Sequence, residues 1–327
     1  MWINEAFAHY FAFLADWKFI GANEGNVNAW CRESRNWNCS CFRTVNENGW
    51  FFYTMKFQEK MHSVNYQGPL YQKGRAWIDH LPYIYEWGAM FVRMLEATIG
   101  RALFQKAMQR YIKTYQYGNV DHEKLWSALE YVNPFKDENV TISNIFNSWI
   151  HQRGVPFLHV SRSKAKGTEN ILNLRQVHYS GPKGNRSALS PSVWYIPINF
   201  ILIREVNGTY ERIPNDNYVH QYLMKNTSET VKMSIHEYTK SDNHLVAILN
   251  VNFSGTYHVG YDENEWKRIG SVLMANSSLI PWFDRLQFVD SLKTSIRREE
   301  IQPHLLLCIG EYIQVSSSSI VQLIKTD

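Results

Sequence analysis

The sequence predicts an α+β multidomain fold in which helices come first, short strands follow and helices return. Residues 2–154 carry their apolar side chains largely at helical spacing. Residues 155–261 instead contain short runs of β-branched and aromatic residues, separated by Gly, Pro, Asn and Ser, which is typical of a small antiparallel β-sandwich. Helical spacing returns from residue 262. We therefore predict three domains, with the ranges 1–154, 155–261 and 262–327.

The first region is expected to form several amphipathic helices. Three of them are predicted over residues 2–20, 84–99 and 102–114. Asp121 is a predicted N-cap for the next helix, and Thr141 is a predicted N-cap for a helix over residues 142–150. The helix over 102–114 presents three basic residues on one face, which we interpret as a solvated face rather than a binding stripe. These residues are Lys106, Arg110 and Lys113.

The strands and helices after residue 155 are predicted from the length of the apolar runs and from the spacing of apolar residues within them. The expected strands are residues 157–160, 171–179, 193–204, 218–224, 245–251 and 256–261. Two further helices are expected over residues 263–274 and 280–295. The tail beyond them carries no predicted element.

Composition and charge exclude several classes of protein. With 327 residues, 45% of them hydrophobic and 20% charged, the chain can form a large core. The net charge is only +4 and no Lys/Arg block is present, which argues against a nucleic-acid partner. No run of apolar residues is long enough to span a membrane, and the first residues lack the pattern of a signal peptide. Membrane association is expected only through an anchor outside this sequence.

The cysteines leave their pairing open. Cys31, Cys39 and Cys41 cluster in an Asn-rich stretch, and Cys308 lies near the end of the chain. A disulfide from Cys31 to Cys39 or Cys41 and free thiols in a loop are both compatible with this spacing. A zinc knuckle is disfavoured because no C-x-x-C pair is present.

Asparagine-linked glycosylation acceptors bear on the compartment. Seven N-x-S/T sequons occur and favour a secretory route, hence an extracellular or plasma-membrane ectodomain, with a cytoplasmic protein as the alternative. The acceptors are Asn38, Asn139, Asn185, Asn207, Asn226, Asn252 and Asn276.

The catalytic motifs that are easiest to recognise are absent from the sequence. It contains no G-x-S-x-G, no P-loop, no G-x-G-x-x-G and no H-E-x-x-H. Glu5 and His9 are four residues apart and would share one helix face, which is a spacing that metal ligands use. Two ligands do not make a zinc site, so spacing alone does not establish one.

A resemblance to a known family gives Glu5 a role. Residues 2–11, W-I-N-E-A-F-A-H-Y-F, resemble the W-L-N-E-G-F-A-x-Y motif of aminopeptidase-N-like zinc metalloaminopeptidases, the gluzincin family. In that family two histidines of an H-E-x-x-H helix bind zinc, and the glutamate of this second motif is the third ligand. The resemblance implies that Glu5 is a zinc ligand and that His9 is not.

A second motif implies a catalytic tyrosine. Residues 83–96, Y-I-Y-E-W-G-A-M-F-V-R-M-L-E, resemble I-S-Y-x-K-G-A-x-V-x-R-M-L-E of the same family. The family's tyrosine hydrogen-bonds the oxyanion of the tetrahedral intermediate, and it corresponds to Tyr85. A phenol suits that role because it donates one hydrogen bond and is neutral at pH 7. The family's lysine is Trp87 here, which removes a charge beside the expected site.

The remaining matches occur in the family's order. They comprise residues 111–126, 148–156, 194–198, 250–262 and 285–290. The resemblance implies the C-terminal helical half of a thermolysin-like catalytic domain, a β-sandwich domain and the start of an α-helical domain. It implies Zn²⁺ as cofactor and peptides as substrates, from which zinc-activated water releases the N-terminal residue. Whether the protein forms a homodimer is left open by the resemblance.

The resemblance covers only part of the family pattern. The H-E-x-x-H helix, the N-terminal domain and the G-x-M-E-N loop have no counterpart in these residues. We therefore expect a fragment of a longer enzyme, with Met1 an internal methionine, that is inactive alone. The alternatives are a short non-catalytic relative that binds peptides or a partner, and a secreted adhesion module.

Overall fold

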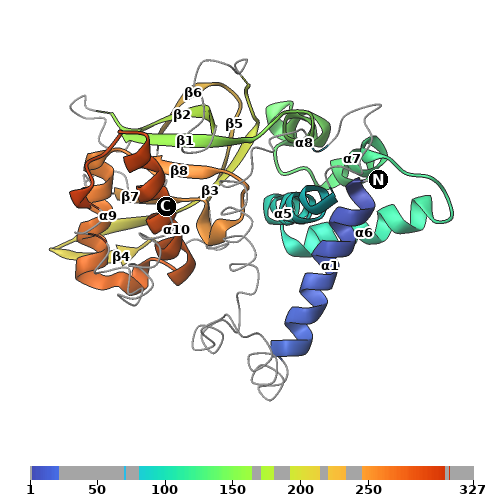
Figure 1. The fold of residues 1–327 in the computed structure, drawn as a ribbon, viewed down its shortest axis with the longest axis horizontal. Coiled ribbons are helices and arrows are strands. Elements are labelled where there is room, and N and C mark those ends of the chain that lie inside the picture. Colours follow the sequence, from blue (N-terminus) through green and yellow to red (C-terminus); the bar gives the residue numbers. More distant parts are fainter. Residues whose placement is uncertain are drawn as a thin grey trace. The chain divides into compact units, whose positions relative to one another are not determined.

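The computed structural model describes residues 2–21, 70, 81–163, 171–179, 192–213, 220–232, 245–305 and 309. The chain forms two compact units, Met1–Ser143 and Asn144–Asp327, and each is described by itself (Figure 1). The three domain ranges expected from the sequence remain a prediction. Within the described ranges, no helix combines the length and apolarity needed to cross a bilayer.

The first unit is helical, as predicted. Among its described residues, the α-helices are α1 (Trp2–Gly21), α5 (Leu81–Ile99), α6 (Arg101–Tyr115) and α7 (His122–Leu129), followed by the 3₁₀ turns Glu130–Val132 and Lys136–Glu138. Asp121 caps α7 as expected, because its carboxylate accepts a hydrogen bond of 3.0 Å from the backbone N–H of Lys124. The core is aromatic: the ring of Phe91 stacks on Trp87 and meets Trp2 edge-on, with centroids 5.6 Å apart in both pairs.

A short helix, α8 (Ile142–Ile150), leads into the second unit. Trp149 is completely buried, and its indole N–H donates a hydrogen bond of 2.8 Å to the backbone carbonyl of Tyr195. This bond gives a buried indole N–H the acceptor that it requires.

The second unit contains two sheets, with helices packed against them (Figure 1). Its strands are β1 (Val155–Arg162), β2 (Ile171–Tyr179), β3 (Ile196–Val206), β4 (Thr209–Arg212), β5 (His220–Met224), β6 (Ser228–Lys232), β7 (Leu245–Leu249) and β8 (His258–Tyr261). One sheet has the strand order β6-β2-β1-β8, and in the other β3 pairs with β4, β5 and β7. The predicted antiparallel pairing is confirmed with one exception, because β8 runs parallel to β1 with His258 opposite Phe157.

Two of these strands were missing from the sequence-based prediction. Residues 209–212 and 228–232, which form β4 and β6, are mostly polar and are not continuous apolar runs. Among the residues that the structure describes, each pairs with one strand, β4 with β3 and β6 with β2. Most of the side chains of β4 and β6 stay in contact with water. A prediction based on apolar runs therefore missed both.

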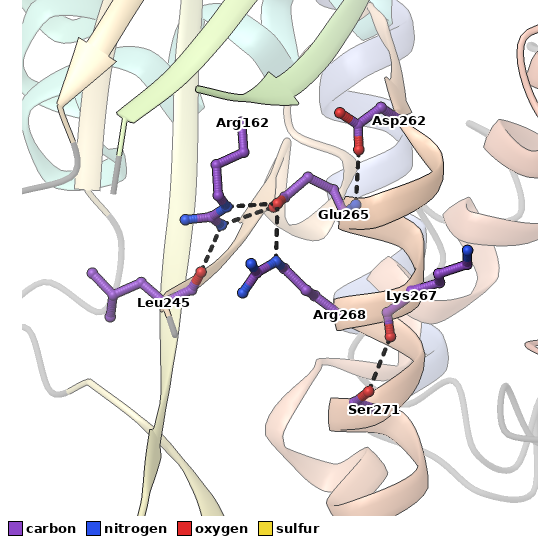
Figure 2. Close-up of polar contacts among 7 residues, drawn as sticks. All are labelled: Arg162, Leu245, Asp262, Glu265, Lys267, Arg268 and Ser271. Atoms are coloured by element: carbon purple, nitrogen blue, oxygen red, sulfur yellow. Dashed lines mark hydrogen bonds and ion pairs between the residues drawn. The ribbon is translucent and has the colours of Figure 1, made fainter. Parts of the chain in front are cut away.

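The C-terminal helices of this unit are α9 (Glu263–Asn276) and α10 (Trp282–Arg297), close to their predicted ranges. A buried ion pair joins α9 to the sheets: Arg162 Nε and Nη2 donate to the two carboxylate oxygens of Glu265, at 2.6 and 2.9 Å (Figure 2). The same Nη2 donates to the carbonyl oxygen of Leu245 at 2.6 Å. One guanidinium thus connects β1, β7 and α9.

Candidate active site

The two helices that carry the predicted site residues pack closely. Helices α1 and α5 pack against each other, and Ala6 faces Gly88 at a point of close approach. A Cβ atom added to Gly88 would lie 2.6 Å from the Cβ of Ala6, which is closer than real Cβ contacts come. The absence of a side chain at Gly88 therefore lets the two backbones approach.

This approach places the two predicted site residues in contact. The hydroxyl of Tyr85, on α5, donates a hydrogen bond to the carboxylate of Glu5, on α1. Both side chains are partly exposed, so the pair is accessible to solvent. The bond to Glu5 raises the pKa of Tyr85, and burial and the Glu5 charge act in the same direction. Tyr85 therefore stays protonated at neutral pH and remains a hydrogen-bond donor.

His9 lies one helical turn after Glu5 and also contacts Tyr85. The two rings meet edge to face, with centroids 5.9 Å apart and planes inclined by 69°. Burial lowers the pKa of His9, an effect that the nearby charge of Glu86 opposes. In the sequence, the spacing of Glu5 and His9 is compatible with metal binding, and the family resemblance implies that His9 is not a ligand. Neither argument indicates the ring contact with Tyr85.

A second contact fastens α1 to α5 beyond this site. The hydroxyl of Tyr10, a completely buried residue, donates a hydrogen bond to the carboxylate of Glu96. Burial is the main cause that raises the pKa of Tyr10, and the Glu96 charge adds to it. The relative position of the two helices is thus held by a packed glycine and by two tyrosine–glutamate pairs.

Trp87, which stands where the family has a lysine, belongs to the core. Its side chain is 0% exposed and stacks on Phe91. The replacement therefore exchanges a cation for buried aromatic surface, and the packing shows how the helix accommodates it.

The described residues do not by themselves form a zinc site. Structural and catalytic zinc ions in proteins take three or four protein ligands, chosen from Cys, His, Asp and Glu. Among the parts of the chain that the structure describes, no three such residues converge at a metal-binding geometry. Glu5 is one candidate ligand with an accessible carboxylate, and any further ligands lie outside these residues.

The other predicted sites divide between exposed positions and the part of the chain that is not described. Five of the sequon asparagines have exposed side chains, which is compatible with glycosylation and leaves it a prediction. These are Asn139, Asn207, Asn226, Asn252 and Asn276. The sequons at Asn38 and Asn185, and the four cysteines, lie outside the described residues.

The basic face of α6 is exposed, as its interpretation as a solvated face requires. The side chains of Lys106, Arg110 and Lys113 all face solvent. The guanidinium of Arg110 lies over the ring of Tyr131, 4.8 Å from its centroid.

A cavity of about 520 Å³ lies in the second unit, lined by β1, β2, β6, β8 and Glu300. Its acidic groups have structural partners: Glu300 pairs with His159 at 3.4 Å and with Arg298 at 2.8 Å. Asp262 accepts a hydrogen bond from the backbone N–H of Glu265 and so caps α9. None of the site residues predicted from the sequence lines this cavity.

Comparison with known proteins agrees with the motifs. Residues 1–149 match the peptidase family M1 domain. The chain is 27% identical to aminopeptidase Q of Homo sapiens over 243 residues, which cover 73% of this chain and 22% of that protein. It is 26% identical to aminopeptidase N of Rattus norvegicus over 298 residues, covering 88% of this chain and 26% of that protein.

A third relative is named as an ectoenzyme. The thyrotropin-releasing hormone-degrading ectoenzyme of Homo sapiens is 22% identical over 324 residues, which cover 96% of this chain and 27% of that protein. The chain thus spans about a quarter of the length of these three relatives.

Proposed function

The chain is a member of the aminopeptidase-N-like family, with its peptidase family M1 match in residues 1–149, and we propose that it is part of a zinc-dependent aminopeptidase. In this proposal Glu5 is a zinc ligand and Tyr85 stabilises the transition state. The substrates are peptides that lose their N-terminal residue by hydrolysis.

One observation carries the proposal. Glu5 and Tyr85 belong to separate motifs on separate helices, yet the hydroxyl of Tyr85 hydrogen-bonds the carboxylate of Glu5. A metal ligand and an oxyanion donor must lie within one active site, since both act on the same carbonyl group. The contact satisfies that geometric requirement.

The chemistry divides between the metal and this chain. Zinc, when bound, supplies a Lewis acid and a water molecule whose pKa is lowered to about 7. Glu5 provides one carboxylate, and we place the remaining ligands outside the described residues, on an H-E-x-x-H helix. Tyr85 keeps its proton at neutral pH, and its hydroxyl donates to the substrate oxygen as negative charge develops there.

The proposal extends to the compartment. The exposed sequons and the ectoenzyme among the relatives support an extracellular or membrane-attached enzyme, whose anchor would lie outside these residues. Peptides in that compartment are the substrates that this placement implies.

The test compares substitutions in the protein expressed from the complete native transcript. Glu5→Ala is expected to lose bound zinc, as measured by metal analysis of the purified protein. Tyr85→Phe is expected to keep zinc and to lower kcat by about 100-fold or more, because one oxyanion donor is lost. Glu138→Ala and Tyr131→Phe remove an exposed carboxylate and an exposed phenol of the same unit, and both should leave zinc and kcat unchanged.

Two results would overturn the proposal. Normal turnover in Tyr85→Phe would remove the assigned role of Tyr85. A native transcript without an in-frame H-E-x-x-H upstream of Glu5, together with a product that binds no zinc, would instead favour a non-catalytic, peptide-binding relative.

A further inference from the structure

We infer that His9 is a positioning residue for Tyr85. Its imidazole holds the phenol ring in the orientation in which the hydroxyl can donate to the Glu5 carboxylate or to the substrate oxygen. This inference rests on the proposed function, because it assumes that Tyr85 acts in the reaction. It concerns the ring contact of His9 and gives this histidine no role as a metal ligand.

Helix α1 contacts Tyr85 at two points. Glu5 and His9 are four residues apart and therefore lie on one face of α1, a single turn from each other. Glu5 accepts the hydrogen bond from the hydroxyl of Tyr85, and the imidazole of His9 packs against the ring, with centroids 5.9 Å apart. The polar end and the aromatic body of Tyr85 each have a separate partner on the same helix.

Both contacts are needed to define the position of the hydroxyl. A tyrosine side chain turns about two torsions, and a single hydrogen bond at its end permits several combinations of them. An edge-to-face ring contact restricts the ring plane as well. When Glu5 is engaged elsewhere, as a metal ligand must be, the His9 contact remains and keeps the ring in place.

The close packing of the α1 and α5 backbones also contributes to this arrangement. The close approach of Ala6 and Gly88 sets the separation of α1 and α5 between the positions of Glu5 and His9. The helices therefore determine where the Tyr85 backbone lies, and His9 determines how its ring is turned. Catalytic groups lose much of their effect when displaced by about 1 Å, so such support has a measurable consequence.

The experiment compares His9→Ala with His9→Phe in the protein expressed from the complete native transcript. His9→Ala removes the ring contact, and kcat should fall by about 3- to 10-fold, with KM and zinc content unchanged. His9→Phe preserves an aromatic ring at this position, so kcat should return to within about twofold of the wild-type value. His122→Ala serves as the control, because His122 is a buried histidine of the same unit that packs on Trp126, with centroids 6.4 Å apart.

Each outcome separates the inference from the proposed function. A wild-type kcat in His9→Ala, beside an inactive Tyr85→Phe, would overturn the role of His9 and leave the proposed function intact. An equal loss of kcat in His9→Ala and His122→Ala would show a general structural effect and would also overturn it. Loss of zinc in His9→Ala would make His9 a ligand instead. Full activity of Tyr85→Phe would overturn the proposed function itself.

Discussion

The hydroxyl of Tyr85 donates a hydrogen bond to the carboxylate of Glu5, and this bond joins two helices that are far apart in the sequence. The two residues lie in different sequence motifs, and neither motif indicates a contact between them. The packing of α1 on α5 creates the contact, because Gly88 allows the backbones to approach at Ala6.

Gly88→Ala is expected to lower the free energy of unfolding by about 1–3 kcal/mol, because the added methyl group overlaps Ala6. The control is Gly270→Ala in α9, where the added Cβ would meet its nearest neighbour at an ordinary 3.7 Å. That change should stabilise the protein by about 0.5–1 kcal/mol, the gain from replacing glycine within a helix. Urea denaturation followed by circular dichroism measures both, and equal effects would show that the contact at Ala6 is unimportant.

Arg162→Met is expected to destabilise the second unit by about 3–5 kcal/mol, because it removes the buried cation that donates two hydrogen bonds to the carboxylate of Glu265 and leaves only the partly exposed Arg268, 3.5 Å away. The double variant Arg162→Met, Glu265→Leu removes both charges and should recover most of that loss. Arg204→Met breaks the more exposed pair with Glu211 and should cost no more than about 1 kcal/mol. If denaturant titrations show the same loss in the free energy of unfolding for Arg162→Met and Arg204→Met, the buried pair contributes no more to stability than the exposed pair.

Acidification is expected to weaken the second unit through His178. Its Nε2–H donates to the carbonyl oxygen of Arg153 at 3.0 Å, and its Nδ1 is buried without a hydrogen-bond partner among the described residues. Burial lowers the pKa of His178, although the Arg153 carbonyl partly opposes the shift. The unfolded chain then binds a proton near pH 6.5 while the folded chain does not, so stability falls as pH drops below about 6.5.

The measurement is the free energy of unfolding at pH 7 and at pH 5. His178→Gln should lose less stability between these two values than the wild type does. His304→Gln removes an exposed histidine and controls for the loss of one imidazole. A wild-type pH dependence in His178→Gln would exclude His178 as the cause.

The exposed sequons are expected to carry glycans when the protein is expressed through the secretory pathway. Asn207 occupies the turn between β3 and β4 and is exposed, so Asn207→Gln should remove one glycan. The measurement is the electrophoretic mobility of the protein before and after an amidase removes its asparagine-linked glycans, and the variant should show a smaller change than the wild type. Asn119→Gln changes an exposed asparagine outside any sequon and should alter nothing. A secreted product whose mobility the amidase does not change would contradict the prediction.

Several elements were predictable because their physical cause is local. The helices of the first unit follow apolar residues at helical spacing, and Asp121 caps α7 by accepting from the N–H of Lys124, three residues along the chain. The hairpin of β3 and β4 could also have been predicted from the sequence, although the predicted strands did not include β4. Its turn is Asn207-Gly208, both with positive φ, which is a strong hairpin signal in sequence.

Other features depend on which segments meet. The parallel pairing of β8 with β1 leaves no trace in the alternation of either strand. Arg162 and Glu265 lie 103 positions apart, and each alone would be read as an exposed charge. Trp87 looked like a replacement beside the site, but the period of α5 directs it into the core against Phe91.

The sequence by itself determined the succession of helices, strands and helices, the family motifs, and Glu5 and Tyr85 as candidate site residues. Only the tertiary structure decided that Tyr85 meets both Glu5 and His9, and that a buried guanidinium joins α9 to the sheets. The reason is physical: periodicity and capping arise from neighbours along the chain. Hydrogen bonds and ring contacts between distant segments arise only when packing brings their backbones together.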